Sequence, residues 1–239
     1  MREDVPTDRI LIVGVGGLGV PALWSLARAG ARRVTLVDPD PVELSNLARQ
    51  VIFRDRDIGT AKVDAAARWL GERFPNVKVE AHAVSLDASN AARLVAAHDF
   101  VIDATDSPVA KFLINDTCLA TRTPFVYGGV VGMTGQAMTV IPTETACIRC
   151  VFETVPDESE IQTCREAGIV GPVAGAIGEM QAGEAMRASR AQLFLLSGKI
   201  LTYDASGTCR VRITGVRPRP GCGCGASKQD HRESQSPGK

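Results

Sequence analysis

The 239-residue sequence lacks an excess of charge of either sign. Its 27 lysines and arginines balance its 27 aspartates and glutamates, so the formal net charge at pH 7 is zero. A chain without net charge has no overall field that would attract nucleic acid or an anionic membrane surface. We therefore expect no nucleic acid partner, and an acidic partner would have to meet a local basic patch.

Long apolar runs and an export signal are also lacking. No stretch approaches the roughly 20 consecutive apolar residues that a membrane helix needs. The opening residues, MREDVPTDRILIVG, show no basic segment followed by an apolar segment and a cleavage site. We expect a cytoplasmic protein with no membrane partner. In such a chain, seven cysteines favour metal ligation or thiol chemistry over a disulfide framework.

The apolar runs that do occur are short and alternate with helical patterns. Residues 10–15 (ILIVGV) are typical of a strand buried on both faces of a parallel sheet. Further strands are predicted at 34–37, 77–84, 100–102 and 125–130, and helices at 20–28, 60–74, 88–97 and 108–121. This alternation predicts an α/β fold with a Rossmann-like, mainly parallel sheet and helices on both faces.

The pattern changes after Gly135. Shorter strands of antiparallel character are predicted at 136–141, 200–204 and 209–213, with a helix of small residues at 171–188. Residues 153–168 are polar and without periodicity, which indicates a long loop. We expect one domain over residues 1–225, followed by a disordered tail at 226–239, because that tail has almost nothing to bury.

A glycine-rich turn follows the first predicted strand and leads directly into a helix. Its glycines are Gly14, Gly16, Gly17 and Gly19. Such a turn lets backbone N–H groups at a helix N-terminus approach a phosphate. Asp38 ends the second strand at the spacing expected for a partner of the ribose hydroxyls. Alone, these features predict a nucleotide site for NAD, FAD or ATP, or a mere tight turn.

A polar segment over residues 38–50 distinguishes among these ligands. It contains Asp38, Asp40, Asn46, Arg49 and Gln50, and it is followed by Lys62 and by Asp106. An arginine, a lysine and a carboxylate near the carboxyl ends of parallel strands match a triphosphate with Mg²⁺. Taken singly, Arg49 and Lys62 could instead be solvated surface charges, and Asp106 could cap the helix at 108–121.

These motifs together resemble the E1-like adenylating family of ThiF, MoeB and HesA over residues 9–225. The resemblance rests on GxGGxG, on D-x-D-x-V-x-x-S-N-L-x-R-Q, on Lys62 about a turn into the next helix and on Asp106 after the fourth strand. It implies that Asp38 holds the ribose, that Asn46, Arg49 and Lys62 bind phosphates, and that Asp106 holds Mg²⁺.

The cysteines suggest two further sites. Cys147 and Cys150, with Cys222 and Cys224, could close one tetrahedral, structural Zn²⁺ site. The alternative is a redox CxxC motif. Cys118 and Cys209 are predicted to be small core residues. Cys164 stands in the long polar loop, where the resemblance implies a cysteine that links to the activated carrier protein. Its alternative is an ordinary loop thiol.

The resemblance implies a homodimeric adenylyltransferase that uses ATP. Its substrate would be the C-terminal carboxylate of a ubiquitin-like sulfur carrier ending in Gly-Gly, similar to ThiS or MoaD. Arg49, Lys62, Asp106 and Cys164 would be the catalytic residues, and a separate protein would supply sulfur. Family members usually carry an N-terminal arm whose arginine reaches the neighbouring protomer's ATP, and this sequence lacks it.

Other interpretations remain open from the sequence. The missing arm suggests a non-catalytic nucleotide-binding subunit, and the glycine turn alone suggests an NAD-dependent oxidoreductase. Adenylation could also act on a small-molecule carboxylate or on tRNA, although the neutral net charge weakens the tRNA version. The sequence does not distinguish thiamine from molybdopterin or secondary-metabolite pathways.

Overall fold

The apolar runs form the parallel half of one sheet. The computed structural model describes residues 9–155 and 168–225. In it, β1 (Arg9–Val13), β2 (Arg33–Val37), β3 (Lys78–His82), β4 (Phe100–Asp103) and β5 (Phe125–Val131) pair in parallel, in the order β3-β2-β1-β4-β5. The order reverses between β1 and β4, so the carboxyl ends of these strands open a crevice where α/β proteins bind ligands.

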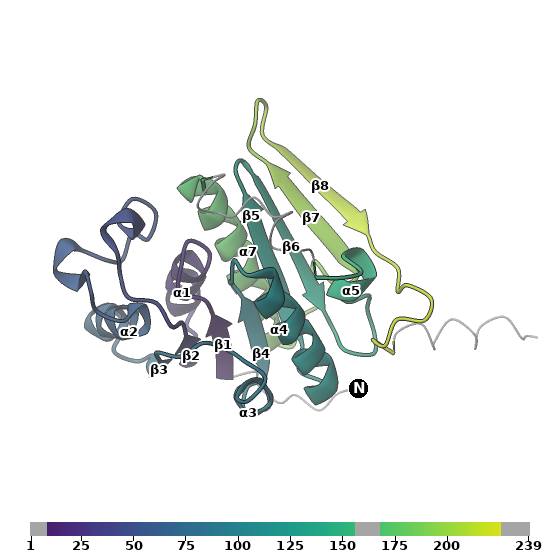
Figure 1. The fold of residues 1–239 in the computed structure, drawn as a ribbon, viewed down its shortest axis with the longest axis horizontal. Helices are drawn as coiled ribbons and strands as arrows, with labels where there is room; N and C mark the ends of the chain where they lie inside the picture. The colour runs from purple at the N-terminus through teal and green to yellow at the C-terminus, as the bar shows by residue number, and fades with distance from the viewer. Residues whose placement is uncertain (1–8, 156–167, 226–239) are drawn as a thin grey trace, which may run out of the picture.

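Three antiparallel strands extend the sheet beyond β5. They are β6 (Thr134–Val140), β7 (Lys199–Asp204) and β8 (Arg210–Gly215), in the order β5-β6-β7-β8. The predicted fold class, a mainly parallel sheet with an antiparallel C-terminal extension, is therefore confirmed. β7 and β8 project from the rest of the molecule as a long hairpin (Figure 1).

Helices cover both faces of the sheet (Figure 1). One apolar core joins the sheet to α1 (Gly19–Arg28), α2 (Lys62–Arg73) and α7 (Gly171–Ser189). A second core joins the opposite face to α3 (Ala91–Ala96), α4 (Pro108–Thr121) and α5 (Ile148–Val151). Two short 3₁₀ helices, η1 (Leu44–Asn46) and η2 (Asp55–Asp57), lie between β2 and α2.

Three sequence predictions need correction. The helix predicted at 88–97 is limited to Ala91–Ala96, because Asp87 accepts the Ser89 N–H at 2.8 Å and so forms a local turn that competes with the helix. Lys62 is the first residue of α2 and does not lie a turn inside it. Cys209 is exposed, because it precedes the exposed strand β8 with a φ of 51°, whereas Cys118 is buried as predicted.

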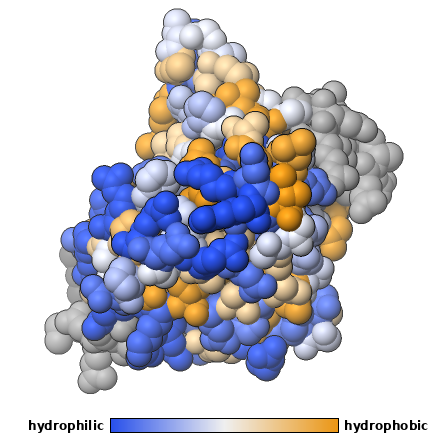
Figure 2. Space-filling model, turned by 90° about the vertical axis from the view of Figure 1, so that its left-hand side faces the viewer, coloured by the Kyte–Doolittle hydropathy of each residue, from blue (hydrophilic) through white to orange (hydrophobic). Residues whose placement is uncertain are grey.

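Several predictions fall on residues beyond those described. Cys164, most of the predicted loop at 153–168 and the predicted tail at 226–239 lie outside the described residues. Within residues 9–155 and 168–225, no helix is both long and apolar enough to cross a membrane. The side of the molecule that carries α2 and the loop before it is largely hydrophilic (Figure 2).

Candidate functional site: a nucleotide cleft at the carboxyl edge of the sheet

The glycine turn after β1 brings the backbone of Gly14 close to the backbone that follows β4. Gly14 has a φ of +94°, and a Cβ there would lie 2.5 Å from the Ala104 carbonyl oxygen. Any other residue at position 14 would therefore strain the turn and push the β4 end away. A Cβ at Gly19 would overlap the Gly14 carbonyl oxygen. These glycines let α1 start directly above β1, so that its N-terminus faces the crevice.

Asp38 is held rigidly beside this turn. Its carboxylate accepts the Val15 N–H at 2.6 Å and the Asp40 N–H at 2.9 Å, and the residue is 6% exposed. Burial raises the pKa of the Asp38 carboxyl above its ordinary value, while Lys62 and the two N–H groups oppose the rise. The oxygens keep acceptor capacity that could bind ribose hydroxyls.

Lys62 is a buried cation and not a solvated surface charge. The residue is 7% exposed, and its Nζ lies 2.7 Å from Asp40 Oδ2 and 4.0 Å from Asp38 Oδ1. Asp40 is itself exposed, so Lys62 could exchange this surface carboxylate for an anionic ligand. The surface interpretation of Lys62 is therefore wrong.

Asn46, Arg49 and Gln50 close the cleft from the side of η1. Asn46 is 5% exposed and accepts the Glu43 N–H at 3.2 Å. Arg49 Nη1 donates to the Ser45 carbonyl at 2.9 Å, and its Cδ would lie 4.0 Å from a Cβ at Gly17. Gln50 is 2% exposed, and no described residue hydrogen-bonds to its Oε1. This part of the site retains unused donors and acceptors.

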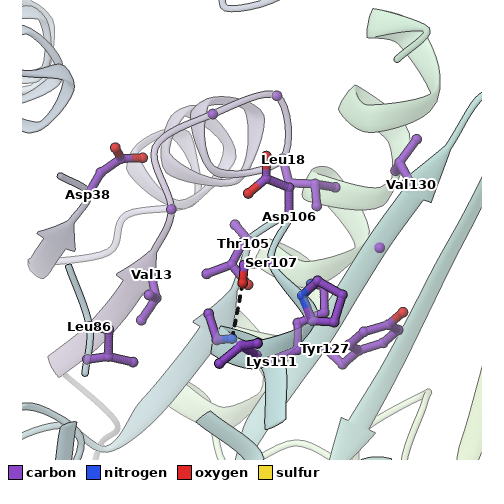
Figure 3. Close-up of a pocket in the computed structure, with 18 of the residues that line it drawn as sticks. Val13, Leu18, Asp38, Leu86, Thr105, Asp106, Ser107, Lys111, Tyr127 and Val130 are labelled. Atoms are coloured by element: carbon purple, nitrogen blue, oxygen red, sulfur yellow. Dashed lines mark hydrogen bonds between the residues drawn. The ribbon is translucent and has the colours of Figure 1, made fainter. Parts of the chain in front are cut away.

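Asp106 presents a carboxylate without a described partner. It stands three residues beyond β4 and is exposed, and no hydrogen bond or ion pair among the described residues involves its side chain. The N-cap of α4 is Ser107, whose side chain accepts the Ala110 N–H at 3.4 Å. The alternative interpretation of Asp106 as the helix cap is therefore wrong. Figure 3 shows Asp38 and Asp106 both at the pocket.

One cavity of about 1810 Å³ gathers these side chains. Of the residues predicted to bind the nucleotide, Gly19 does not line the cavity. Gly19 instead allows the close contact with the Gly14 backbone. The predicted residues that line the cavity are Gly14, Gly16, Gly17, Asp38, Asp40, Asn46, Arg49, Gln50, Lys62 and Asp106. Their individual roles remain predictions, although the fold brings the set together.

Lys111 and Tyr127 are among the cavity residues that the sequence did not identify. Lys111 interrupts the otherwise apolar stretch Val109–Ile114 on α4, and its isolation among apolar neighbours was the available signal. Tyr127 lies on β5, where the next two residues are glycines, Gly128 and Gly129. Nothing in a short strand motif distinguishes a cavity tyrosine from a core tyrosine.

The four predicted zinc ligands converge beneath the second core. Cys147 is the N-cap of α5 and Cys150 lies within this helix. The Cys147 sulfur lies 3.6 Å from Cys222 Sγ, and the Cys150 sulfur lies 3.8 Å from Cys224 Sγ. All four Sγ atoms lie within 4.8 Å of one another. Zn–S bonds of about 2.3 Å in a tetrahedron place sulfurs roughly 3.8 Å apart. The donor set therefore fits a structural Zn²⁺ ion.

Comparison with known proteins gives the family. The ThiF family matches residues 2–224. The chain is 38% identical to the molybdopterin-synthase adenylyltransferase of Escherichia coli K12, over 92% of this chain and 88% of that protein. It is 39% identical to the SAMP-activating enzyme E1 of Haloferax volcanii, over 83% of this chain and 73% of that protein.

Longer relatives and solved structures complete the comparison. The chain is 36% identical to the adenylyltransferase and sulfurtransferase MOCS3 of Arabidopsis thaliana, but it spans only 47% of that protein. A crystal structure of E. coli MccB with ATP matches 92% of this chain with a TM-score of 0.80 at 21% identity, which shows the same fold. This chain belongs to the ThiF family of E1-like adenylating enzymes.

Proposed function

We propose that this protein is an ATP-dependent adenylyltransferase that activates the C-terminal glycine carboxylate of a ubiquitin-like sulfur carrier. The observation that carries the proposal is the cleft itself, where the glycine turn, a buried lysine, an arginine and a carboxylate without a partner among the described residues surround one cavity. The printed names of the relatives, a molybdopterin-synthase adenylyltransferase and a SAMP-activating enzyme, support the choice of substrate class.

In the proposed reaction, a carboxylate oxygen of the carrier attacks the α-phosphorus of ATP. A new acyl–phosphate bond forms, the bond to the β-phosphate oxygen breaks, and pyrophosphate leaves with its electron pair. Asp38 holds the ribose, and the glycine turn and Asn46 hold phosphate oxygens. Arg49 and Lys62 neutralise the charge that grows on the departing pyrophosphate.

The cleft also suits the expected metal ion. An exposed carboxylate such as Asp106 is the oxygen ligand that Mg²⁺ takes together with substrate phosphates. When bound there, Mg²⁺ would neutralise phosphate charge and orient the leaving group. Gln50, whose buried Oε1 lacks a described partner, would complete the polar wall beside the glycine turn.

The remaining parts of the proposal rest on the family likeness. They are a homodimer, a separate protein that donates sulfur, and a covalent role for Cys164, which lies outside the described residues. The four cysteines would hold a structural Zn²⁺ ion that ties the segment after β8 to α5.

The test is carrier-dependent exchange of labelled pyrophosphate into ATP. Loss of one preorganised donor to the transition state typically costs about 10² to 10³ in rate. We therefore expect Lys62→Ala and Arg49→Ala to lose that much exchange while ATP binding changes less, because their contacts strengthen as pyrophosphate departs. Lys78→Ala, which removes an exposed lysine of β3 outside the cleft, is the matched control.

Two results would contradict the assignment. Exchange by Lys62→Ala at the wild-type rate would show that the cleft is not the adenylation site. Loss of exchange in Cys164→Ala would contradict the proposed order of steps, because adenylation precedes any thiol chemistry. In the expected case, Cys164→Ala exchanges normally and forms the sulfur-containing product slowly.

A further inference from the structure

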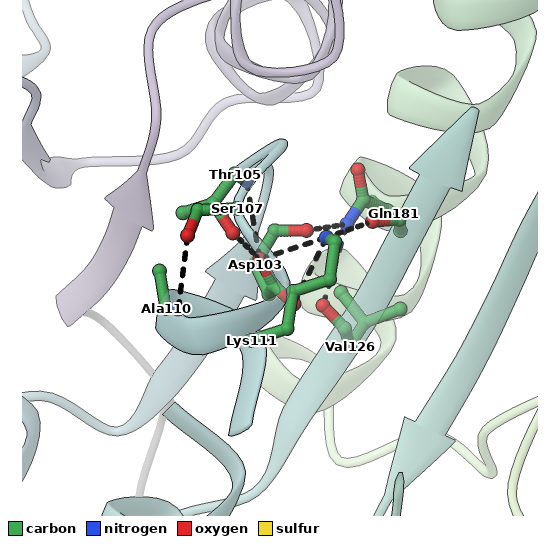
Figure 4. Close-up of polar contacts among 8 residues, drawn as sticks. Asp103, Thr105, Ser107, Ala110, Lys111, Val126 and Gln181 are labelled. Carbon is green, nitrogen blue, oxygen red and sulfur yellow. Dashed lines mark hydrogen bonds and ion pairs between the residues drawn. The ribbon is translucent and has the colours of Figure 1, made fainter. Parts of the chain in front are cut away.

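Lys111 is a buried cation that the proposed reaction does not use. It lies on the first turn of α4 and is 9% exposed. Its Nζ lies 3.3 Å from both carboxylate oxygens of Asp103, donates to the Gly128 carbonyl at 2.5 Å, and stands 4.8 Å from the centre of the Tyr127 ring. The ammonium group therefore has a carboxylate, a carbonyl and an aromatic ring around it, and Figure 4 shows its contacts with Asp103.

The partner of Lys111 controls the turn that leads to Asp106. Asp103 is the last residue of β4 and is 0% exposed. Its Oδ1 accepts the Thr105 N–H at 3.1 Å and the Thr105 hydroxyl at 2.7 Å. The carboxylate therefore fixes the turn one residue before Asp106. Removal of Lys111 would leave the buried Asp103 carboxylate without the cation beside it, which is costly.

The same position is braced from the opposite face of the sheet. Gln181 on α7 is 0% exposed, and its Nε2 donates to the Asp103 carbonyl at 2.6 Å and to the Val126 carbonyl at 3.3 Å. A Cβ at Gly128 would lie 2.5 Å from the Gln181 amide carbon, so β5 passes against this amide without a side chain. Hydrogen bonds from α7 to β4 and β5 therefore fix the backbone that carries Asp103.

We propose that Lys111 is a positioning residue, which acts through Asp103 to hold the Asp106 carboxylate where it binds Mg²⁺. The proposal rests on the metal-binding role of Asp106 in the proposed function. Its physical basis is that residues that orient a metal ligand affect metal affinity strongly, with losses of about 10- to 100-fold on mutation. In this proposal Lys111 acts through Asp103 and not by direct contact with ATP or metal.

The experiment measures binding of Mn²⁺, as a spectroscopic substitute for Mg²⁺, to the protein saturated with ATP. Electron paramagnetic resonance counts free and bound Mn²⁺ and needs no carrier protein. We expect Lys111→Met to weaken Mn²⁺ binding by about 10-fold or more. ATP binding measured in the presence of EDTA should hardly change, and Lys111→Arg, which keeps the charge and the donors, should recover most of the Mn²⁺ affinity.

A matched control separates positioning from general destabilisation. Glu184 on α7 is another buried charge, 2% exposed, which accepts the Thr139 hydroxyl at 2.6 Å and does not line the cavity. Glu184→Gln should lower the melting temperature and leave Mn²⁺ affinity unchanged. Thr105→Val, which removes one hydrogen bond to Asp103 and leaves the buried pair intact, serves if Lys111→Met does not fold.

The outcomes decide the proposal independently of the carrier. It is overturned if folded Lys111→Met or Thr105→Val binds Mn²⁺ as tightly as the wild type, if Glu184→Gln weakens binding equally, or if Asp106→Asn does not weaken it. A wild-type protein that exchanges no pyrophosphate with any carrier would reject the proposed function. The Mn²⁺ comparison would still decide the role of Lys111.

Discussion

At Asp38, the proposed nucleotide binding and the folding of the chain favour different protonation states of the carboxyl group. Its folded-state pKa is raised, chiefly by burial, above the ordinary value of 3.8. A raised folded pKa means that Asp38 contributes stability below the ordinary pKa and that this contribution is lost as pH rises through the raised pKa. In the proposed function the ionised carboxylate of Asp38 accepts the ribose hydroxyls, and burial disfavours this ionised form relative to the unfolded chain.

We therefore predict that ATP affinity falls as pH drops through the raised pKa of Asp38, at a higher pH than for an ordinary aspartate. Calorimetric titration with ATP from neutral to mildly acidic pH measures this profile. Asp38→Asn should bind ATP weakly with little dependence on pH over that window. Asp64→Asn, which alters an exposed carboxylate of α2, should keep the wild-type profile, and a flat wild-type profile would contradict the prediction.

The motif residues show what sequence predicts well at this scale. That Arg49, Lys62 and Asp106 line one cavity was predictable, because they follow β2 and β4, and the carboxyl ends of these parallel strands open at the same edge of the sheet. The environment of each was not predictable. Sequence alone does not show that Asp40 pairs with Lys62, because this contact depends on the path of the loop between β2 and α2.

At the scale of elements, α1 and α7 pack with their backbones in close contact. A Cβ at Gly178 would overlap the Leu18 carbonyl oxygen and lie 3.2 Å from the Ala22 nitrogen. Gly183 on the same helix has no atom within 4 Å of the corresponding position. Gly178 is therefore required by packing and Gly183 is not, so substitutions at these two positions can be compared directly.

We predict that Gly178→Ala lowers the free energy of unfolding by about 1–3 kcal/mol, as overpacking usually does. Gly183→Ala should raise it by about 0.5–1 kcal/mol, because alanine is the better helix former. Urea denaturation of both variants measures the difference. Equal effects of the two substitutions would show that α1 and α7 do not pack as described.

The cysteine cluster joins two elements that are distant in sequence. Cys147 and Cys222 are 75 residues apart, and closing a chain segment of that length removes unfolded-state entropy worth about 4 kcal/mol. We predict about one Zn²⁺ per chain and a melting temperature that falls by several degrees or more after chelation. A Cys222→Ser/Cys224→Ser double variant that keeps its zinc and full stability, measured by metal analysis and thermal unfolding, would refute this.

Element boundaries were predicted to different degrees, for local reasons. α4 begins after the Ser107-Pro108 pair, which is a typical helix start, and it ends before Arg122, whose φ of 57° is left-handed. The predicted helix before β4 was too long because Asp87 and Asn90 organise their own turns. The place of Cys209 was missed since edge strands such as β8 can carry apolar residues on an exposed face.

For the whole molecule, the alternation of apolar strands and helices was enough to predict the sheet, its parallel half and its antiparallel extension. The contacts that close the site were not predictable. Gln181 reaches β4 from 78 residues away, and no periodic pattern in the sequence encodes that distance. Nucleotide binding should nevertheless act on the entire fold, because the cleft joins the segments that follow β1, β2, β3 and β4.

We predict that ATP raises the melting temperature of the whole protein. At a concentration 100 times the dissociation constant, a ligand adds about 2.7 kcal/mol to the free energy of unfolding. For a chain of this size each kcal/mol corresponds to about 2–4 °C, so the shift should be roughly 5–10 °C. NADH is the control, since an NAD-dependent oxidoreductase would instead be stabilised by NADH and not by ATP.

The sequence positions of the four cysteines also determine when the cluster can form during synthesis. Translation proceeds at about 5–20 residues per second, so a nascent chain that has completed Cys147 waits about 4–15 s for Cys222, 75 residues later. During that interval only two of the four cysteines that would bind zinc have been synthesised. A chaperone or a transient zinc ligand that protects the early cysteine pair would therefore act within this period of synthesis.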